Sequence, residues 1–198
     1  MNGTVFQKTY DVPDINRREI FRYARCKEGT EGIDELIDGC IAESSALLTY
    51  NVRYAYYPIN VTGNTVDMGF VKTESASLAK NLVSCEGVYV FSATVGIAYA
   101  RLIAKYSRIS PARAFILDAF GDERIESLCD AFCAELAEKY EFIRPRFSPG
   151  YGDLDISVQK DIFRSLDPVR IGITLSDSMM MYPPKSVTAI VGVSKKKN

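Results

Sequence analysis

The segment 144–151 contains the residues best suited to binding a small charged ligand. Two prolines restrict its backbone, and Gly150 permits a tight turn or the close approach of a ligand. Arg146 can offer a two-pronged set of donors to a carboxylate. Tyr151, five residues later, can cover a flat or cationic group. The alternative is a structural turn whose arginines face solvent, and composition alone favours that alternative.

Three other groups of residues have the types that metal or redox sites use. Cys129 and Cys133 are four residues apart, so a helix places both thiols on one face, although apolar neighbours favour unreactive buried thiols. The run 179–181 offers three thioethers, yet such runs more often pack in a core or form a contact surface. The third group is a set of four carboxylates, Asp118, Asp122, Glu123 and Glu126. A solvated helix face explains them better than a metal site.

Catalysis by the chain's own residues is disfavoured by its composition. The sequence contains no histidine, which excludes Ser-His-Asp and Cys-His nucleophile systems and the commonest general base at neutral pH. The Gly-rich patterns that bind dinucleotides or nucleoside triphosphates are also absent. We therefore expect no catalytic residue and no metal site in this chain.

The bulk composition suits one domain of a cytoplasmic protein. The chain has 198 residues, of which 47% are hydrophobic, and a formal net charge of −1. A single domain over residues 1–198 is expected, and the charge balance argues against a nucleic-acid partner. No signal peptide or membrane-length apolar run is found. The five cysteines fit reduced thiols in the cytoplasm better than a disulfide framework.

Helices and strands alternate without the regular pattern of a parallel sheet. Helices are predicted over 14–25, 30–48, 75–83, 96–106, 110–140 (broken or kinked near Gly121) and 156–166. Strands are predicted over 51–60 and 65–71, as a hairpin around Gly63-Asn64, and over 88–91, 142–146, 171–175 and 186–193. This order predicts an α+β domain with a twisted, mostly antiparallel sheet and packed helices.

Five segments in this order are similar to a known family. They are Phe91–Gly96, Leu117–Gly121 with the following Glu126 and Asp130, Arg146–Tyr151, Val158–Phe163 and Leu175–Val187. Arg146–Tyr151 resembles the Arg-x-x-x-Gly-Tyr signature of the activation (reactivation) domain of cobalamin-dependent methionine synthase. Together the five segments resemble that domain from about Phe91 to Val193.

The resemblance implies a ligand and a role for each site residue. Such domains bind S-adenosylmethionine and dock onto a cobalamin-binding domain, where the ligand methylates cobalt after a flavoprotein has reduced it. By this resemblance Arg146 grips the ligand carboxylate, the backbone around Ser148 and Gly150 meets the adenine, and Tyr151 lines the place where ligand and corrinoid approach. Asp130 holds the ligand's amino group or sulfonium. An acidic contact from the family's N-terminal part has no recognisable position here.

The expected function is therefore that of a reactivation subunit in a split methionine synthase or a related corrinoid methyltransferase. The chain would bind S-adenosylmethionine, while cobalamin would be carried by a separate partner chain. A flavodoxin-like reductant is a further expected partner, and this chain alone would hold no complete catalytic centre. The alternative is a non-catalytic scaffold or chaperone that binds a corrinoid protein without S-adenosylmethionine.

Overall fold

A five-stranded antiparallel sheet forms the centre of the computed structural model, which describes residues 3–194. The strand order is β1-β2-β6-β10-β7. These strands are β1 (Val5–Thr9), β2 (Asn51–Pro58), β6 (Gly87–Thr94), β7 (Phe142–Ile143) and β10 (Ser186–Ser194). A three-stranded sheet contains β3 (Asn60–Thr62), β4 (Thr65–Asp67) and β5 (Lys72–Glu74), and a two-stranded sheet contains β8 (Thr174–Leu175) and β9 (Met181–Tyr182).

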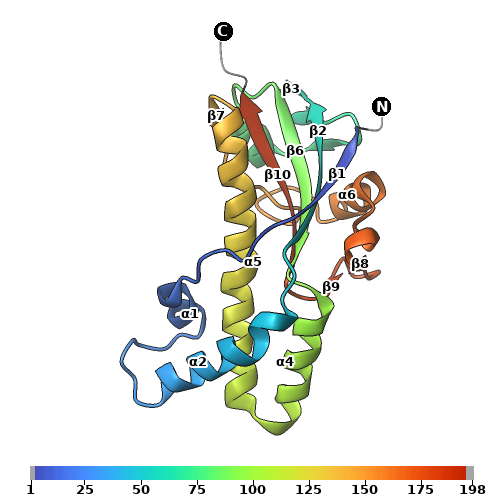
Figure 1. Ribbon diagram of the computed structural model, residues 1–198. Coiled ribbons are helices and arrows are strands. Elements are labelled where there is room, and N and C mark those ends of the chain that lie inside the picture. Colours follow the sequence, from blue (N-terminus) through green and yellow to red (C-terminus); the bar gives the residue numbers. More distant parts are fainter. Residues whose placement is uncertain (1–2, 195–198) are drawn as a thin grey trace.

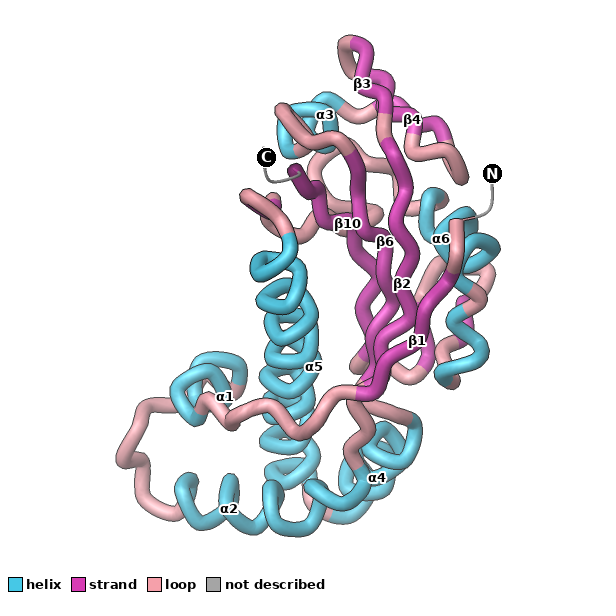
Figure 2. The backbone as a smooth tube through the Cα atoms, turned by 45° about the horizontal axis from the view of Figure 1, so that its top comes forward, coloured by secondary structure: helices cyan, strands magenta, loops and turns pink. Residues whose placement is uncertain are grey.

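The helices cover both faces of the main sheet (Figures 1 and 2). They are α1 (Arg17–Tyr23), α2 (Ile33–Ser44), α3 (Ala76–Asn81), α4 (Ile97–Ile109), α5 (Pro111–Lys139) and α6 (Val158–Leu166). Short 3-10 turns occupy Ser45–Leu47 and Pro168–Ile171. The sequence-based prediction of an α+β fold with an antiparallel sheet is confirmed, since every strand pair is antiparallel.

Side chains of the central strands point alternately to the two faces of the sheet, and each face forms a separate hydrophobic core. Successive side chains of a strand point to opposite faces, and in β6 Phe91 and Ala93 pack toward α5, whereas Val88 and Val90 pack toward α3 and α6. Burial on both faces explains why β6 and β10 read as continuous apolar runs. The first core also includes α1, α2 and α4 and is the larger of the two.

The long helix α5 runs without interruption, so the break expected near Gly121 is wrong. Pro111 opens the helix at a position where its missing N–H costs nothing. Gly121 is explained by packing instead, because a Cβ there would lie 2.7 Å from a ring carbon of Tyr99 and 3.0 Å from Cγ of Lys185. The glycine therefore allows α4 and Lys185, which directly precedes β10, to approach α5 closely.

The structure corrects two further expectations about strands. Gly63-Asn64 does turn between β3 and β4, but most of the first predicted arm, 51–60, forms β2, which pairs instead with β1 and β6 in the main sheet. The expected strand 171–175 begins as a 3-10 turn, and only Thr174–Leu175 is extended. No helix within residues 3–194 combines the length and apolar character needed to span a membrane.

Candidate functional site

Arg146 is held against α5 by two carboxylates. Its two terminal nitrogens donate to Oε2 of Glu126 at 2.6 Å and to Oδ1 of Asp130 at 2.8 Å. Glu126 and Asp130 are four residues apart on α5 and therefore share one face. The predicted site residues Arg146 and Asp130 are thus in direct contact.

The backbone on either side of Arg146 is fixed to β10. The N–H of Arg144 donates to the carbonyl of Gly192 at 2.8 Å, and the N–H of Phe147 donates to the carbonyl of Ile190 at 2.9 Å. The guanidinium of Arg146 therefore has a rigid base, and its side chain is 24% exposed. Burial by itself lowers the pKa of Arg146, but the ionisable groups around it raise the pKa above its ordinary value. The side chain stays a cation.

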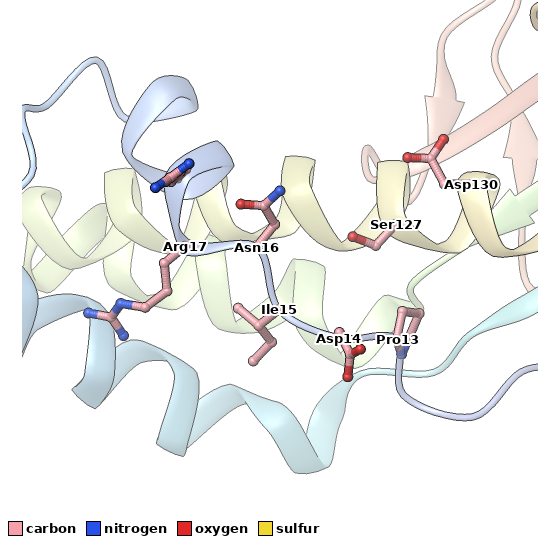
Figure 3. A pocket seen from close by; sticks show the side chains of 8 residues that line it. Pro13, Asp14, Ile15, Asn16, Arg17, Ser127 and Asp130 are labelled. Atoms are coloured by element: carbon pink, nitrogen blue, oxygen red, sulfur yellow. The ribbon is translucent and has the colours of Figure 1, made fainter.

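Three adjoining hollows meet at Asp130, and we call them together the α5 groove. The largest, of about 770 Å³, lies between α5 and the segment Pro13–Arg18 (Figure 3). The second, of about 340 Å³, lies between α1 and α5. The third, of about 330 Å³, is lined by Asp130, Cys133 and the segment Ile143–Arg146. Asp130 is the lining residue that all three hollows share.

A buried ion pair fixes the N-terminal wall of the α5 groove. Glu123 and Arg124 are 1% and 0% exposed and lie 2.5 Å apart. Arg124 also donates to the carbonyls of Pro13 and Asp14, at 2.6 and 2.8 Å. The N–H of Asn16 donates to Glu123 at 3.0 Å. These bonds attach the segment before α1 to the middle of α5.

The predicted residues Ser148, Gly150 and Tyr151 form the turn that follows Arg146. The N–H of Tyr151 donates to the carbonyl of Ser148 at 3.1 Å, and Gly150 has a φ of +85°, which favours glycine. The Tyr151 side chain is 69% exposed and its ring meets that of Phe147 edge to face. None of the three hollows described above is lined by Ser148, Gly150 or Tyr151. The structure therefore brings together Arg146 and Asp130 but not these three residues, and Phe147 beside them packs in the core with α3 and α6.

Asp153 anchors the same turn to α3. Its carboxylate accepts from the Ser75 hydroxyl at 2.5 Å and from the N–H groups of Ala76 and Ser77 at 2.8 and 3.0 Å. The Ser75 hydroxyl, followed by these backbone donors, lowers the pKa of Asp153 to about 2. The helix terminus therefore fixes the position of the turn that carries Gly150 and Tyr151.

Three of the four carboxylates in the group at 118–126 of α5 are at least partly exposed, as expected for a solvated helix face, and each also forms an ion pair, whereas Glu123 is buried. Lys185 binds Asp118 at 2.9 Å and Asp122 at 2.6 Å. Glu123 and Glu126 bind Arg124 and Arg146, as described above. Within residues 3–194, no group of three or more candidate ligand side chains is placed to hold a metal ion.

The thiols and thioethers take structural or exposed positions. Burial raises the pKa of both Cys129 and Cys133, and both are free thiols, as expected for unreactive cysteines. Met180 is 69% exposed, whereas Met179 and Met181 are half-buried. The side chain of Gln159 donates to the carbonyl of Met179 at 3.3 Å and so connects this run to α6.

Sequence reasoning missed the contribution of α1 and the segment before it. Glu19 and Tyr23 line the second hollow, and Asp14 lines the first. At least 100 positions separate them from Glu123 and Asp130, so no local spacing could have indicated the contact. One indication of such a contact was present in the sequence: two adjacent charged residues, Glu123 and Arg124, lie among the apolar residues of α5 that face the core.

Two comparisons with known proteins find a similar family and a similar fold. Residues 120–198 match the family described as vitamin B12 dependent methionine synthase, activation domain. The solved structure of the MetH reactivation domain bound to AdoHcy superposes with a TM-score of 0.73 and 13% identity, over 100% of this chain and 80% of that chain. The resemblance to the methionine synthase activation domain is confirmed. No curated protein matches the sequence.

The two matches differ in what they cover. All five predicted site residues lie within the part that matches the activation-domain family, which begins at Phe120. The structural similarity extends to the whole chain, including α1 and the wall of the α5 groove. At 13% identity, this similarity establishes the reactivation-domain fold.

Proposed function

We propose that this chain binds S-adenosylmethionine in the α5 groove and supports the reactivation of cobalamin carried by a partner chain. The observation that carries the proposal is the contact between Arg146 and Asp130, where the three hollows meet. It places a cation and an anion side by side at the mouth of a groove. The structural neighbour bound to AdoHcy supports a ligand of this class.

The charges of the α5 groove fit those of the proposed ligand. S-adenosylmethionine carries a carboxylate, an ammonium group and a sulfonium. Arg146 would bind the carboxylate, and Asp130, which is 74% exposed, would turn toward the ammonium group or sulfonium. Glu19 lines the hollow between α1 and α5, where Arg22 binds its carboxylate, and we propose it as the N-terminal acidic contact.

The turn after Arg146 would hold the other end of the ligand. The backbone at Ser148 and Gly150 would meet the adenine, as the resemblance implies. Gly150 itself is explained by its positive φ and by Ile156, whose Cδ1 would lie 2.9 Å from an added Cβ. The bound ligand supplies a methyl group on its sulfonium. The chain's own contribution is to orient that group toward a partner, since none of the described residues supplies a histidine base.

The exposed ring of Tyr151 marks the side on which the partner would dock. We propose a cobalamin-binding protein as this partner and a flavodoxin-like protein as the electron donor, within a methyltransferase system. The free thiols agree with a cytoplasmic location. We further propose that residues 1–198 act as one domain.

One observation favours the second candidate, a scaffold or chaperone that binds a corrinoid protein without S-adenosylmethionine. Arg146 is already neutralised by two carboxylates, so a ligand carboxylate must displace at least one of them. A chain that had lost its ligand would keep this pair as a structural contact.

Reactivation itself is the test that separates the two functions. Oxidised cobalamin on a cobalamin-binding methionine synthase fragment is mixed with reduced flavodoxin, S-adenosylmethionine and this chain. The proposal expects methylcobalamin, followed by its absorption spectrum, to form faster with the chain than without it. A scaffold would bind the fragment and leave the rate unchanged, and no binding to the fragment would contradict both functions.

A further inference from the structure

The helix α4 and its flanks form the longest stretch of the chain without an acidic residue. Residues 87–117 contain no Asp or Glu, although the whole chain has 25 acidic residues in 198. The same stretch contains four cationic side chains, Arg101, Lys105, Arg108 and Arg113. This asymmetry is unusual in a chain whose net charge is −1.

Three of these cations share the outer face of α4. Arg101, Lys105 and Arg108 follow an i, i+4, i+7 spacing, so they lie in a row on the side of the helix away from the buried Tyr99. All three are exposed. We call these three side chains the basic row; along the helix it spans about 10 Å at about 1.5 Å per residue. The fourth cation, Arg113, binds Glu43 at 2.7 Å and is not part of the row.

The basic row places three cations on one helix face with no ion-pair partner among residues 3–194, unlike α1, the C-terminal part of α5 and α6. Cations on α1, the C-terminal part of α5, and α6 bind acidic residues three or four positions away. Among the described residues, no carboxylate lies within ion-pair distance of a side chain of the basic row. Exposed faces that only meet water usually mix both signs of charge.

An apolar groove lies beside the basic row, between α4 and α5. It consists of two hollows of about 270 and 360 Å³ that share Ile103, Ser107 and Asp118. Phe115, 51% exposed, and Tyr182, 49% exposed, contribute aromatic surface to this region. The carboxylate of Asp118 is engaged by Lys185 at 2.9 Å, so the groove itself is not strongly acidic.

We propose that the basic row and the α4–α5 groove form a docking surface for a protein with an acidic, partly apolar face. Charge complementarity selects the sign of the partner, and aromatic and arginine side chains next to a groove are typical of protein interfaces. This surface lies at the lower end of the molecule in Figure 1, around α4 and the N-terminal part of α5. The inference is independent of S-adenosylmethionine binding, because none of these residues lines the α5 groove.

Other anionic partners fit the surface less well. A membrane-surface helix exposes a continuous apolar face to lipid, whereas most large apolar side chains of α4 pack against the core and the exposed ones are the terminal Ile97 and Ile109. A nucleic acid presents phosphates over a long track, whereas the basic row is short and the chain is acidic overall, with a pI of about 5.6.

The experiment uses a designed amphipathic peptide, with leucine on one face and glutamate on the other, as the probe. Titration into the full-length ¹⁵N-labelled chain is followed by amide chemical shifts at low and high salt. Binding should perturb residues 97–118 and the neighbourhood of Tyr182, and it should weaken as salt rises. The variant R101E/K105E/R108E should weaken it about tenfold or more. The control K27E/K72E/K160E makes the same change of net charge at other exposed lysines and should leave the affinity unchanged.

Several outcomes would overturn the proposal. Equal loss of affinity in both triple variants would mean that net charge alone drives binding. Shift changes outside α4, the start of α5 and the neighbourhood of Tyr182 would place the surface elsewhere. Tighter binding, at the basic row, of a DNA duplex or of phosphatidylserine vesicles than of the peptide would identify a different class of partner. The thermal midpoints of both variants, measured in parallel, establish that each is folded.

Discussion

Arg146 and Asp130 meet at 2.8 Å although they are 16 positions apart in the chain. Arg146 comes from the segment beside β10 and is largely buried, whereas Asp130 comes from α5 and is 74% exposed. The arginine is therefore the fixed partner and the aspartate the one with room to move. A ligand with both a carboxylate and an ammonium group could exchange partners with this pair without leaving either charge uncompensated.

Replacing Asp130 by asparagine should weaken the binding of S-adenosylmethionine by about tenfold, since hydrogen bonds to charged groups contribute about 1.5–3 kcal/mol and this site is open to water. Calorimetric titration measures the effect. Methylthioadenosine, which has neither carboxylate nor ammonium group, is the control ligand and should bind both proteins equally. An equal loss for both ligands would show that Asp130 acts through the fold.

Replacing Arg124 by methionine should destabilise the chain by about 3–5 kcal/mol, because it leaves the Glu123 carboxylate buried without its partner. The change also removes the donors to the carbonyls of Pro13 and Asp14. Urea unfolding measures the free energy. The matched control is Arg164→Met in the exposed pair with Asp161, which should cost at most about 0.5 kcal/mol. Similar costs for both variants would refute the anchoring role.

Asp153 should make stability depend on pH in the acid range. Its pKa is lowered in the folded chain to about 2, from an ordinary value of 3.8, chiefly by the Ser75 hydroxyl. The resulting stabilisation is present above the unfolded-state pKa and is lost as pH falls through the folded-state pKa. Asp153→Asn should therefore lower the thermal midpoint at pH 6 and have a smaller effect near pH 2. A difference from wild type that is constant with pH would contradict this assignment.

Two glycines in helices should respond in opposite directions to alanine. Gly39 in α2 has only the guanidinium of Arg113 nearby, at 3.7 Å from the added Cβ, so Gly39→Ala should stabilise by up to about 1 kcal/mol. At Gly121 the added Cβ would lie 2.7 Å from the Tyr99 ring, so Gly121→Ala should destabilise despite the better helix propensity. Thermal unfolding compares the two, and stabilisation by Gly121→Ala would mean that α4 and α5 are less tightly packed than described.

The sequence predicted those parts of the fold that local patterns determine. The start of α5 at Ser110-Pro111, the turn at Gly63-Asn64 and the turn after Arg146 follow from residue types whose backbone preferences are strong. The predicted hairpin between 51–60 and 65–71 was wrong because the partner of a strand depends on distant segments. Asn51–Pro58 pairs with β1 and β6, and the sequence of β1 did not indicate a strand. The break at Gly121 was wrong because a glycine can serve packing as well as flexibility.

The sequence predicted only the part of the candidate site that belongs to the Arg-x-x-x-Gly-Tyr signature. The turn from Arg146 to Tyr151 was recognisable, whereas the wall formed by α1 was not. That wall depends on the Glu123–Arg124 pair reaching segments more than 100 residues away. The ion pairs of the α5 carboxylates were not predicted, because spacing within one helix does not show which cations the rest of the fold brings to it.

The most direct test of the central claim is calorimetric titration of the chain with S-adenosylmethionine, alongside Arg146→Ala and Arg164→Ala. The account predicts saturable binding to the wild type and to Arg164→Ala. It predicts a loss of about tenfold to a hundredfold in Arg146→Ala, which leaves the ligand carboxylate without its charged partner. ATP, which shares the adenosine but not the amino acid, should not compete. Binding that is unchanged in Arg146→Ala, or no binding to the wild type at millimolar ligand, would contradict the claim.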